Sequence, residues 1–311
     1  MALATQYRSR LDPRPTGKEL VLTPRDDMWF ERLHRHGALP STYLLKYAEL
    51  LGYTCDTYSL LRLGELFNEG YLIRPRQQTN QQLRYRSLVY DLKKLALDVI
   101  GTKDKHREFA PAHAQSMWWH HDFMLSTITA SIELACLAQS EEYEYIFHDE
   151  ICEAMDHALS FNVTYDDQDG KERGALLKPD RAFGIRYLKR QEVRYFLLEA
   201  DRGTETVRSK NVGRKRLIDN YLQYRQFIGA GDYRDAMNYE GGVVLLSVFT
   251  RQARLQALME DLKPNNYMAF VCLPGFDPDR EFVVPDPMLN LFSDGWHRVD
   301  RPIGSIAKGF Q

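Results

Sequence analysis

The stretch LLKPDRAFGIRYLKRQEVRYFLLEADRGTE, residues 176–205, has acidic residues at a spacing that could hold a divalent cation. Asp180 begins one apolar run and Glu199 ends the next, and a turn near Lys189 to Glu192 would pair the two runs as strands. Both carboxylates would then lie at the same end of the pair. Two such carboxylates can hold a cation that lowers the pKa of a bound water and neutralises charge on a phosphate. The stretch therefore predicts a Mg²⁺ or Mn²⁺ site made by Asp180 and Glu199.

The lysine that usually completes this nuclease signature is missing. Its ammonium would orient the attacking water and stabilise charge on the phosphorane. Asp201 stands at that position, shares the strand face of Glu199, and is expected either to be a third ligand or to replace the lysine. Because only the position of the ammonium matters, a lysine of the following helix could serve. We therefore expect a catalytic set of Asp180, Glu199 and Asp201 with Lys210 or Lys215.

A second interpretation gives the same residues a role in the fold alone. Asp180 would then cap its strand, and Glu199 would pair with Arg202 or Arg208. The run "DRGT" would be a tight turn in which Gly203 adopts a positive φ. Motifs for nucleotide hydrolysis or acyl transfer, such as a glycine-rich phosphate loop or a nucleophile elbow, do not occur in the sequence. The clusters "WWHHDF" and "HDEICEAMDH" also lack a metal-ligand spacing, so we expect structural roles there.

The elements that must position these acids form an α/β pattern over residues 112–274. A long apolar helix comes first, then three strands, and then helices alternate with strands. Residues 275–311 hold many Pro, Asp and Gly residues and are expected to be a C-terminal extension. The predicted elements after the first helix are strand 142–149, the strand pair within residues 176–205 with its turn near Lys189 to Glu192, helix 213–228, strand 241–250, helix 251–263 and strand 267–274.

The front of the chain has a different pattern, with three short helices followed by two strands. Thr23 and Pro24 are a typical helix start, and glycines at 37, 52 and 70 end the three helices. Strands at residues 71–75 and 83–92 would form a hairpin around a polar turn. This order predicts a winged helix-turn-helix over residues 22–102, preceded by a flexible basic arm over residues 1–21.

The predicted winged helix has basic and polar side chains where such domains contact double-stranded DNA. Acidic residues at 56 and 65 work against a uniformly basic surface, so a solvated face or a protein-binding module are the alternatives. Ser59 is expected to be exposed beside the other candidates on the third helix. The residues assigned to DNA are Thr57, Tyr58 and Arg62 on the third helix and Arg74, Arg76, Arg84 and Arg86 on the wing.

Composition limits the class of protein. The 311 residues are 44% hydrophobic and 27% charged, which is ordinary for globular domains. Residues 1–105 hold 17 Lys and Arg against 12 Asp and Glu, a net charge of +5, whereas the remainder carries −7. A basic front half is typical of polyanion binding. Four scattered cysteines and the absence of a long apolar stretch favour a cytoplasmic protein without disulfides or a membrane span.

Taken together, the motifs resemble the replication-relaxation family of plasmid and mobile-element proteins. The likeness rests on the front winged helix, "WWHHDF" at a helix start, "LKPDRAF", "FLLEADRGTE" and the Tyr-rich basic helix that follows. The resemblance implies an α+β protein with a divergent PD-(D/E)xK nuclease-like domain and a role in plasmid replication or DNA relaxation. It leaves two functions open: a Mg²⁺- or Mn²⁺-dependent DNA endonuclease or nickase, or a non-catalytic initiator or transcriptional regulator. In the second case the back domain would serve homodimer formation or contacts with replication or mobilisation proteins.

Overall fold

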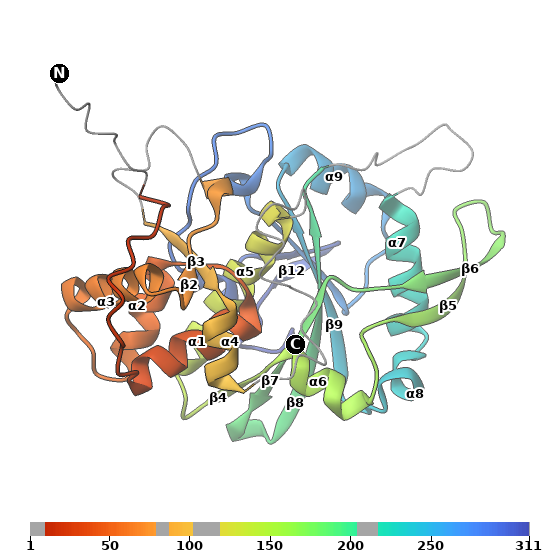
Figure 1. The fold of residues 1–311 in the computed structure, drawn as a ribbon. Coiled ribbons are helices and arrows are strands. Elements are labelled where there is room, and N and C mark those ends of the chain that lie inside the picture. Colours follow the sequence, from red (N-terminus) through yellow and green to blue (C-terminus); the bar gives the residue numbers. More distant parts are fainter. Residues whose placement is uncertain (1–9, 79–86, 102–118, 204–216, 311) are drawn as a thin grey trace. The chain divides into compact units, whose positions relative to one another are not determined.

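The computed structural model describes residues 10–78, 87–101, 119–203 and 217–310 (Figure 1). The chain divides into two compact units. Unit 1 comprises Met1–Ser126 with Val284–Pro287, and unit 2 comprises Thr127–Val283 with Met288–Gln311. Helix α5, Trp119–Leu137, contributes residues to both. The predicted boundary near residue 102 begins a segment outside the described residues, so that division stays a prediction.

Unit 1 contains short helices and a small antiparallel sheet with strand order β1-β3-β2. Helix α1 begins after Thr23, whose backbone N–H and hydroxyl both donate to Asp26 Oδ2 at 2.9 Å. Trp29 packs inside the unit and donates its Nε1 proton to the carbonyl of Leu44 at 2.7 Å. The elements are α1 Pro24–His36, β1 Leu39–Pro40, α2 Ser41–Leu50, α3 Asp56–Asn68, β2 Leu72–Ile73, a 3-10 turn Arg76–Gln78, β3 Val89–Leu92 and α4 Lys94–Ile100.

The described part of the expected flexible arm is held against unit 1. Leu11 and Leu20 are buried, and the backbone N–H of Thr16 donates to Glu69 Oε1 at 2.9 Å. The N–H of Arg14 likewise donates to Asn68 Oδ1 at 2.9 Å, at the end of α3. Residues 10–20 therefore pack against unit 1, in contrast to the expected flexible arm. Two leucines spaced nine residues apart give no periodic signal, so the sequence did not predict their burial.

Unit 2 is built on a mixed seven-stranded sheet in the described part of the chain, with order β12-β11-β10-β9-β8-β7-β4. Strands β8, β9 and β10 run parallel, and the outer pairs are antiparallel. This confirms a mixed α+β fold and the predicted strand and helix alternation. The strands are β4 Tyr143–Ile146, β7 Arg181–Tyr187, β8 Glu192–Asp201, β9 Gly242–Phe249, β10 Met268–Cys272, β11 Trp296–Arg298 and β12 Arg301–Gly304.

Helices close one face of this sheet over a large apolar core. Leu197 of β8 and Leu245 of β9 share that core with Tyr221, Tyr224 and Leu255 of the helices. The helices of unit 2 are α5, α6 His148–Met155, α7 Leu217–Tyr224 with a π-helical continuation Arg225–Gly229, α8 Tyr233–Met237, α9 Gln252–Asp261 and α10 Asn290–Ser293, with 3-10 turns at Leu188–Arg190 and Pro274–Phe276.

Two parts of unit 2 were not expected from the sequence. A hairpin of β5, Phe161–Asp166, and β6, Glu172–Leu177, packs beside α7, with β5 alternating buried and exposed side chains (Figure 1). The alternation in "FNVTYD" before the turn "DQDG" was the available signal. The C-terminal extension also joins the sheet, because β11 pairs with β10 and β12 pairs with β11.

Candidate functional site

The two predicted metal ligands lie at the same end of adjacent strands. Strands β7 and β8 pair with Arg181 opposite Leu198, so the next step in this register sets Asp180 across from Glu199. Asp180 Oδ2 accepts a hydrogen bond from the backbone N–H of Ala200 at 2.8 Å. The hairpin therefore brings the two carboxylates together, while their roles in metal binding and catalysis stay predictions.

A buried tyrosine connects these acids to α7. The hydroxyl of Tyr224 donates to Glu199 Oε1. Burial raises the pKa of Tyr224 well above its usual value, and the negative charges of Glu199 and Asp180 raise it further. Tyr224 therefore stays protonated and can act as a donor to Glu199. The sequence indicated only that a Tyr-rich helix follows the strand pair, and this contact depends on how α7 packs on the sheet.

At the position of the missing lysine, Asp201 forms an ion pair with an arginine from α9. Arg254 Nε lies 2.6 Å from Asp201 Oδ2, and each side chain is only 11% exposed. The other oxygen, Oδ1, accepts the backbone N–H of Gly203 at 2.6 Å. The sequence analysis missed Arg254 because it lies 53 residues from Asp201. Among the described residues Arg202 makes no ion pair, so the alternative pairing of Glu199 with Arg202 is not formed. Lys210, Lys215 and Arg208 lie outside the described residues.

The donor chemistry of Asp180 and Glu199 fits a hard cation. Magnesium takes oxygen ligands and commonly binds through one or two carboxylates while keeping several waters. In the described ranges, no group of three or more His, Cys, Asp or Glu residues is placed to hold a metal ion, and this includes the end of the sheet at Asp180 and Glu199. A Mg²⁺ or Mn²⁺ ion at this pair thus stays a prediction.

The candidates for DNA contact on α3 divide into exposed and buried residues. Thr57 is exposed, and Tyr58 is 69% exposed. Ser59 is fully buried and its hydroxyl accepts from Arg25 Nη1 at 3.1 Å, so the expected exposure of Ser59 is wrong. The helical repeat turns Ser59 toward α1, whereas Thr57 and Tyr58 face outward.

Arg62 holds helices together instead of presenting a charge to solvent. Its side chain is 13% exposed, and Nη2 lies 2.8 Å from Oδ2 of the fully buried Asp26. Further bonds reach Glu65 at 3.0 Å and the carbonyl of Val21 at 2.7 Å. The hydrogen bond to Asp26 is the main cause that raises the pKa of Arg62. The expectation of an exposed Arg62 is therefore wrong, because a buried carboxylate requires a paired cation.

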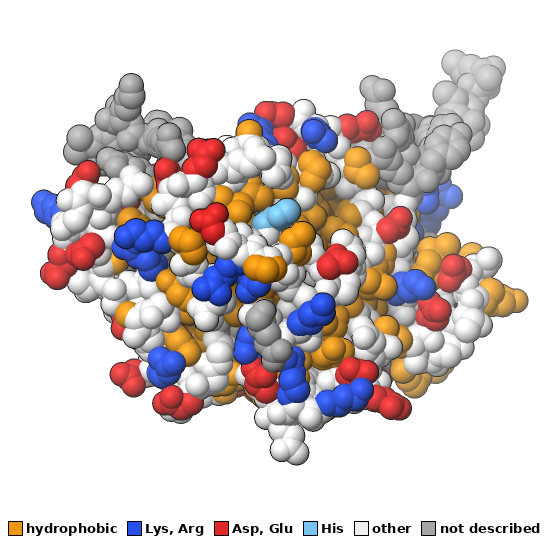
Figure 2. All heavy atoms as spheres, turned by 180° about the vertical axis from the view of Figure 1, so that it is seen from behind, with side chains coloured by type: hydrophobic (Ala, Val, Ile, Leu, Met, Phe, Trp, Pro, Cys, Tyr) orange, Lys and Arg blue, Asp and Glu red, His pale blue; other side chains and the backbone are white. Residues whose placement is uncertain are grey.

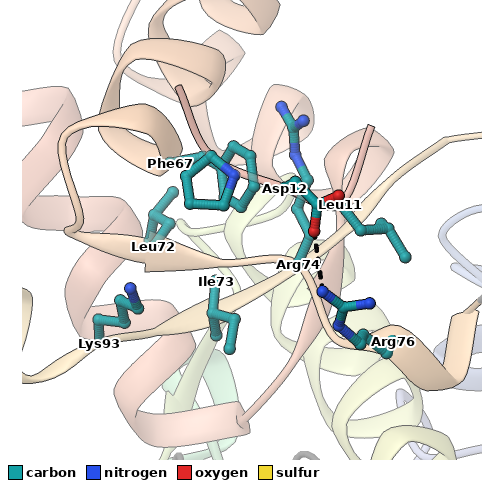
Figure 3. Close-up of a pocket in the computed structure, with 9 residues that line it drawn as sticks. Leu11, Asp12, Phe67, Leu72, Ile73, Arg74, Arg76 and Lys93 are labelled. Carbon is teal, nitrogen blue, oxygen red and sulfur yellow. Dashed lines mark hydrogen bonds and ion pairs between the residues drawn. The ribbon is translucent and has the colours of Figure 1, made fainter. Parts of the chain in front are cut away.

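The two described arginines at the base of the predicted wing contact the N-terminal segment (Figure 3). Arg74 lies 4.0 Å above the Phe67 ring and donates to the carbonyl of Arg10 at 2.6 Å. Arg76 is 75% exposed and pairs with Asp12 at 2.8 Å. They line a pocket of about 220 Å³ with an apolar floor. Arg84 and Arg86 lie outside the described residues.

Acidic and basic side chains are mixed on the face drawn in Figure 2, with apolar side chains between them. The charge difference between the two halves of the sequence thus gives no continuous basic field on that face.

The folds and contacts above define an α+β protein with acidic side chains at the carboxyl end of a parallel strand. The chain belongs to the replication-relaxation family, which matches residues 30–242, about two thirds of its length. No curated protein matches the sequence. One similar solved structure is titled "Structure of SdaI restriction endonuclease", with 10% identity, 81% of this chain and 87% of that chain covered, and a TM-score of 0.19. None of the described helices is long and apolar enough to cross a membrane.

Proposed function

We propose that this protein binds double-stranded DNA of a plasmid or mobile element and hydrolyses a phosphodiester bond during replication or relaxation. The observation that carries the proposal is the β7–β8 register, which sets Asp180 across from Glu199. Membership in the replication-relaxation family supports DNA as the substrate. In this proposal unit 2 is a divergent PD-(D/E)xK domain, and the protein works in the cytoplasm.

Unit 1 would dock on the duplex as a winged helix. Its element order and the β1-β3-β2 sheet support this assignment. Helix α3 would present Thr57 and Tyr58 to the major groove. Arg76, together with Arg84 and Arg86, would contact the phosphate backbone, while Arg62 and Arg74 keep the helix and wing in place.

The carboxylate end of unit 2 would carry the chemistry. A Mg²⁺ or Mn²⁺ ion bound there would activate a water and neutralise charge on the phosphate. Asp180 and Glu199 would hold the ion, and the Tyr224 hydroxyl fixes the orientation of Glu199. Asp201 holds Arg254 at the strand end, so the positive charge that accompanies the acids would come from Arg254 or from Lys210 or Lys215.

Incubation of supercoiled plasmid with the protein and either metal tests this proposal. We expect conversion to open-circular or linear DNA with Mg²⁺ or Mn²⁺, and none with EDTA. Asp180→Asn and Glu199→Gln should abolish conversion because they remove charge while keeping shape. Glu153→Gln, on the exposed part of α6, is the matched control and should leave conversion unchanged. The proposal fails if wild-type protein leaves the plasmid supercoiled, or if Asp180→Asn cuts as well as wild type.

The ion pair of Asp201 with Arg254 favours a second function. Asp201 stands where the nuclease signature has a lysine, and its charge is neutralised by Arg254, so the signature lacks its usual cation. Under this proposal the protein is a non-catalytic initiator or regulator, and unit 2 serves homodimer formation or contacts with replication or mobilisation proteins. DNA binding would then be unaffected by EDTA and by Glu199→Ala, but lost in the double variant Arg76→Ala with Arg84→Ala. A gel-shift series with and without EDTA separates the two functions.

A further inference from the structure

Arg202 follows the site acids at the carboxyl end of β8, yet it has no acidic partner among the described residues. The side chain is partly buried and its Nε is shielded from solvent without a hydrogen bond. Burial lowers the pKa of this guanidinium. A partly desolvated cation without a counter-charge costs free energy, so its retention needs a reason.

The acids near Arg202 are already used by other arginines. Asp201 is paired with Arg254 at 2.6 Å. Asp277 accepts from Arg251 Nη2 at 3.1 Å, and Asp279 also pairs with that guanidinium. Within the part of the chain that the structure describes, Arg202 is thus the arginine at this end of the sheet whose charge is not paired with an acid and can contact a ligand.

A second polar group without a partner lies on the neighbouring strand. Thr250 directly follows β9, and its backbone N–H donates to the carbonyl of Asp201 at 3.2 Å. Asp201 pairs with Phe249 in the parallel register, so the residues that follow, Arg202 and Thr250, are neighbours. Thr250 is 1% exposed, and in the described structure its Oγ1 has no hydrogen-bond partner. The hydroxyl therefore keeps a hydrogen-bonding capacity that the described protein groups do not use.

An arginine beside a hydroxyl donor is suited to a phosphate group. The planar guanidinium matches phosphate geometry, and a hydroxyl adds one more hydrogen bond. In open α/β sheets, ligands bind outside the carboxyl ends of the parallel strands, which is where Arg202 and Thr250 lie. Gly203, with φ of +80°, lets the chain turn away directly after Arg202.

We propose that Arg202 and Thr250 bind a backbone phosphate of the DNA strand that reaches the Asp180–Glu199 pair. This inference rests on DNA being the ligand, as in the proposed function, but it does not require hydrolysis. It assigns to Arg202 a contact with the DNA instead of an ion pair within the fold.

The test measures DNA binding in EDTA, where no cleavage interferes, over a series of salt concentrations. With Arg202→Gln, the slope of log affinity against log salt should fall by about one, and affinity by roughly tenfold at low salt. Arg202→Lys should keep the slope because it keeps the charge. Thr250→Val should weaken binding by a smaller factor without changing the slope.

Thermal unfolding separates this role from a structural one. Because Arg202 has no acidic partner to lose among the described residues, Arg202→Gln should not lower the melting temperature, whereas Arg251→Gln should lower it by leaving Asp277 unpaired. Inorganic phosphate should raise the melting temperature of wild type more than that of Arg202→Gln. An unchanged salt slope, or a loss of melting temperature equal to that of Arg251→Gln, would overturn the inference.

The outcomes remain distinct from those of the cleavage assay. If wild-type protein cuts no plasmid but Arg202→Gln lowers the salt slope, hydrolysis is disproved and the phosphate contact stands. If wild type cuts and the slope does not change, the phosphate contact is disproved and hydrolysis stands.

Discussion

Asp201 of β8 and Arg254 of α9 form an ion pair with 2.6 Å between Oδ2 and Nε. The pair stands where a lysine would complete the nuclease signature, and both side chains are mostly shielded from water. An ion pair in this setting is screened less than one on the surface, and loss of one partner leaves an uncompensated charge. In the proposed nuclease-like domain, this pair would stand in place of the lysine with a two-residue arrangement.

A charge exchange tests this replacement. Asp201→Lys alone should destabilise the protein by roughly 3 kcal/mol, because it sets two cations together and removes the carboxylate that Arg254 contacts. Adding Arg254→Glu should recover much of that loss, since the ion pair forms again with reversed charges. The double variant also restores a lysine to the signature and should cut plasmid at least as well as wild type. Urea unfolding and the plasmid assay measure the two effects; additive losses of stability would contradict direct coupling.

The Tyr224 hydroxyl should stabilise the fold by orienting Glu199. Tyr224→Phe removes the donor and leaves a partly buried carboxylate oxygen, so we expect a loss of about 1–3 kcal/mol in the free energy of unfolding. Plasmid cleavage should also fall as Glu199 loses the hydrogen bond that orients it. Tyr58→Phe, on an exposed side chain, is the matched control and should unfold like wild type. Equal stability of Tyr224→Phe and wild type would contradict the hydrogen bond.

Alkaline pH should weaken the protein through the same tyrosine. The folded-state pKa of Tyr224 is raised well above the usual 10.0, so the folded state keeps a proton that the unfolded state loses. This contribution to stability is fully present below pH 10 and decreases as pH rises above it. Urea unfolding between pH 8 and about 11 should show a smaller decline for Tyr224→Phe than for wild type. Parallel curves for the two proteins would argue against the raised pKa.

Arg62 and Tyr58 should separate folding from DNA contact on α3. Arg62→Ala leaves the buried Asp26 carboxylate unpaired and should cost roughly 3 kcal/mol of stability. Tyr58→Ala should leave stability almost unchanged and weaken DNA binding, because its side chain is exposed in the proposed groove contact. Thermal unfolding and gel shifts on both variants check this. A stable Arg62→Ala would contradict the structural role, and unchanged DNA binding by Tyr58→Ala would contradict the groove contact.

Asp12 should reduce the affinity of the wing for DNA. Its carboxylate pairs with the exposed Arg76, and a surface pair of this kind contributes at most about 1 kcal/mol to stability. Asp12→Asn should therefore leave the melting temperature nearly unchanged and strengthen DNA binding at low salt, whereas Arg76→Ala should weaken it. Glu31→Gln, on an exposed part of α1, controls for the general loss of a negative charge. Equal strengthening by both variants would remove any specific role for Asp12.

The sequence by itself determined the mixed α+β class, the alternation of strands and helices, and the antiparallel strand pair that places Asp180 and Glu199 at one end. These features are local: apolar periodicity marks each element, and the turn before Glu192 sets two neighbouring strands antiparallel. The front helices were predicted for the same reason, with Thr23, Pro24 and the glycines marking their ends.

Only the tertiary structure decided which side chains meet the acids. Arg254 reaches Asp201 across 53 residues because α9 follows β9 and packs over the sheet, and Tyr224 reaches Glu199 in the same way from α7. Burial also decided that Ser59 and Arg62 face the interior, which exposure patterns in a short helix did not reveal. Strands β11 and β12 joined the sheet without a strong local signal. Contacts between residues far apart in sequence depend on how elements pack, and local periodicity carries no information about that packing.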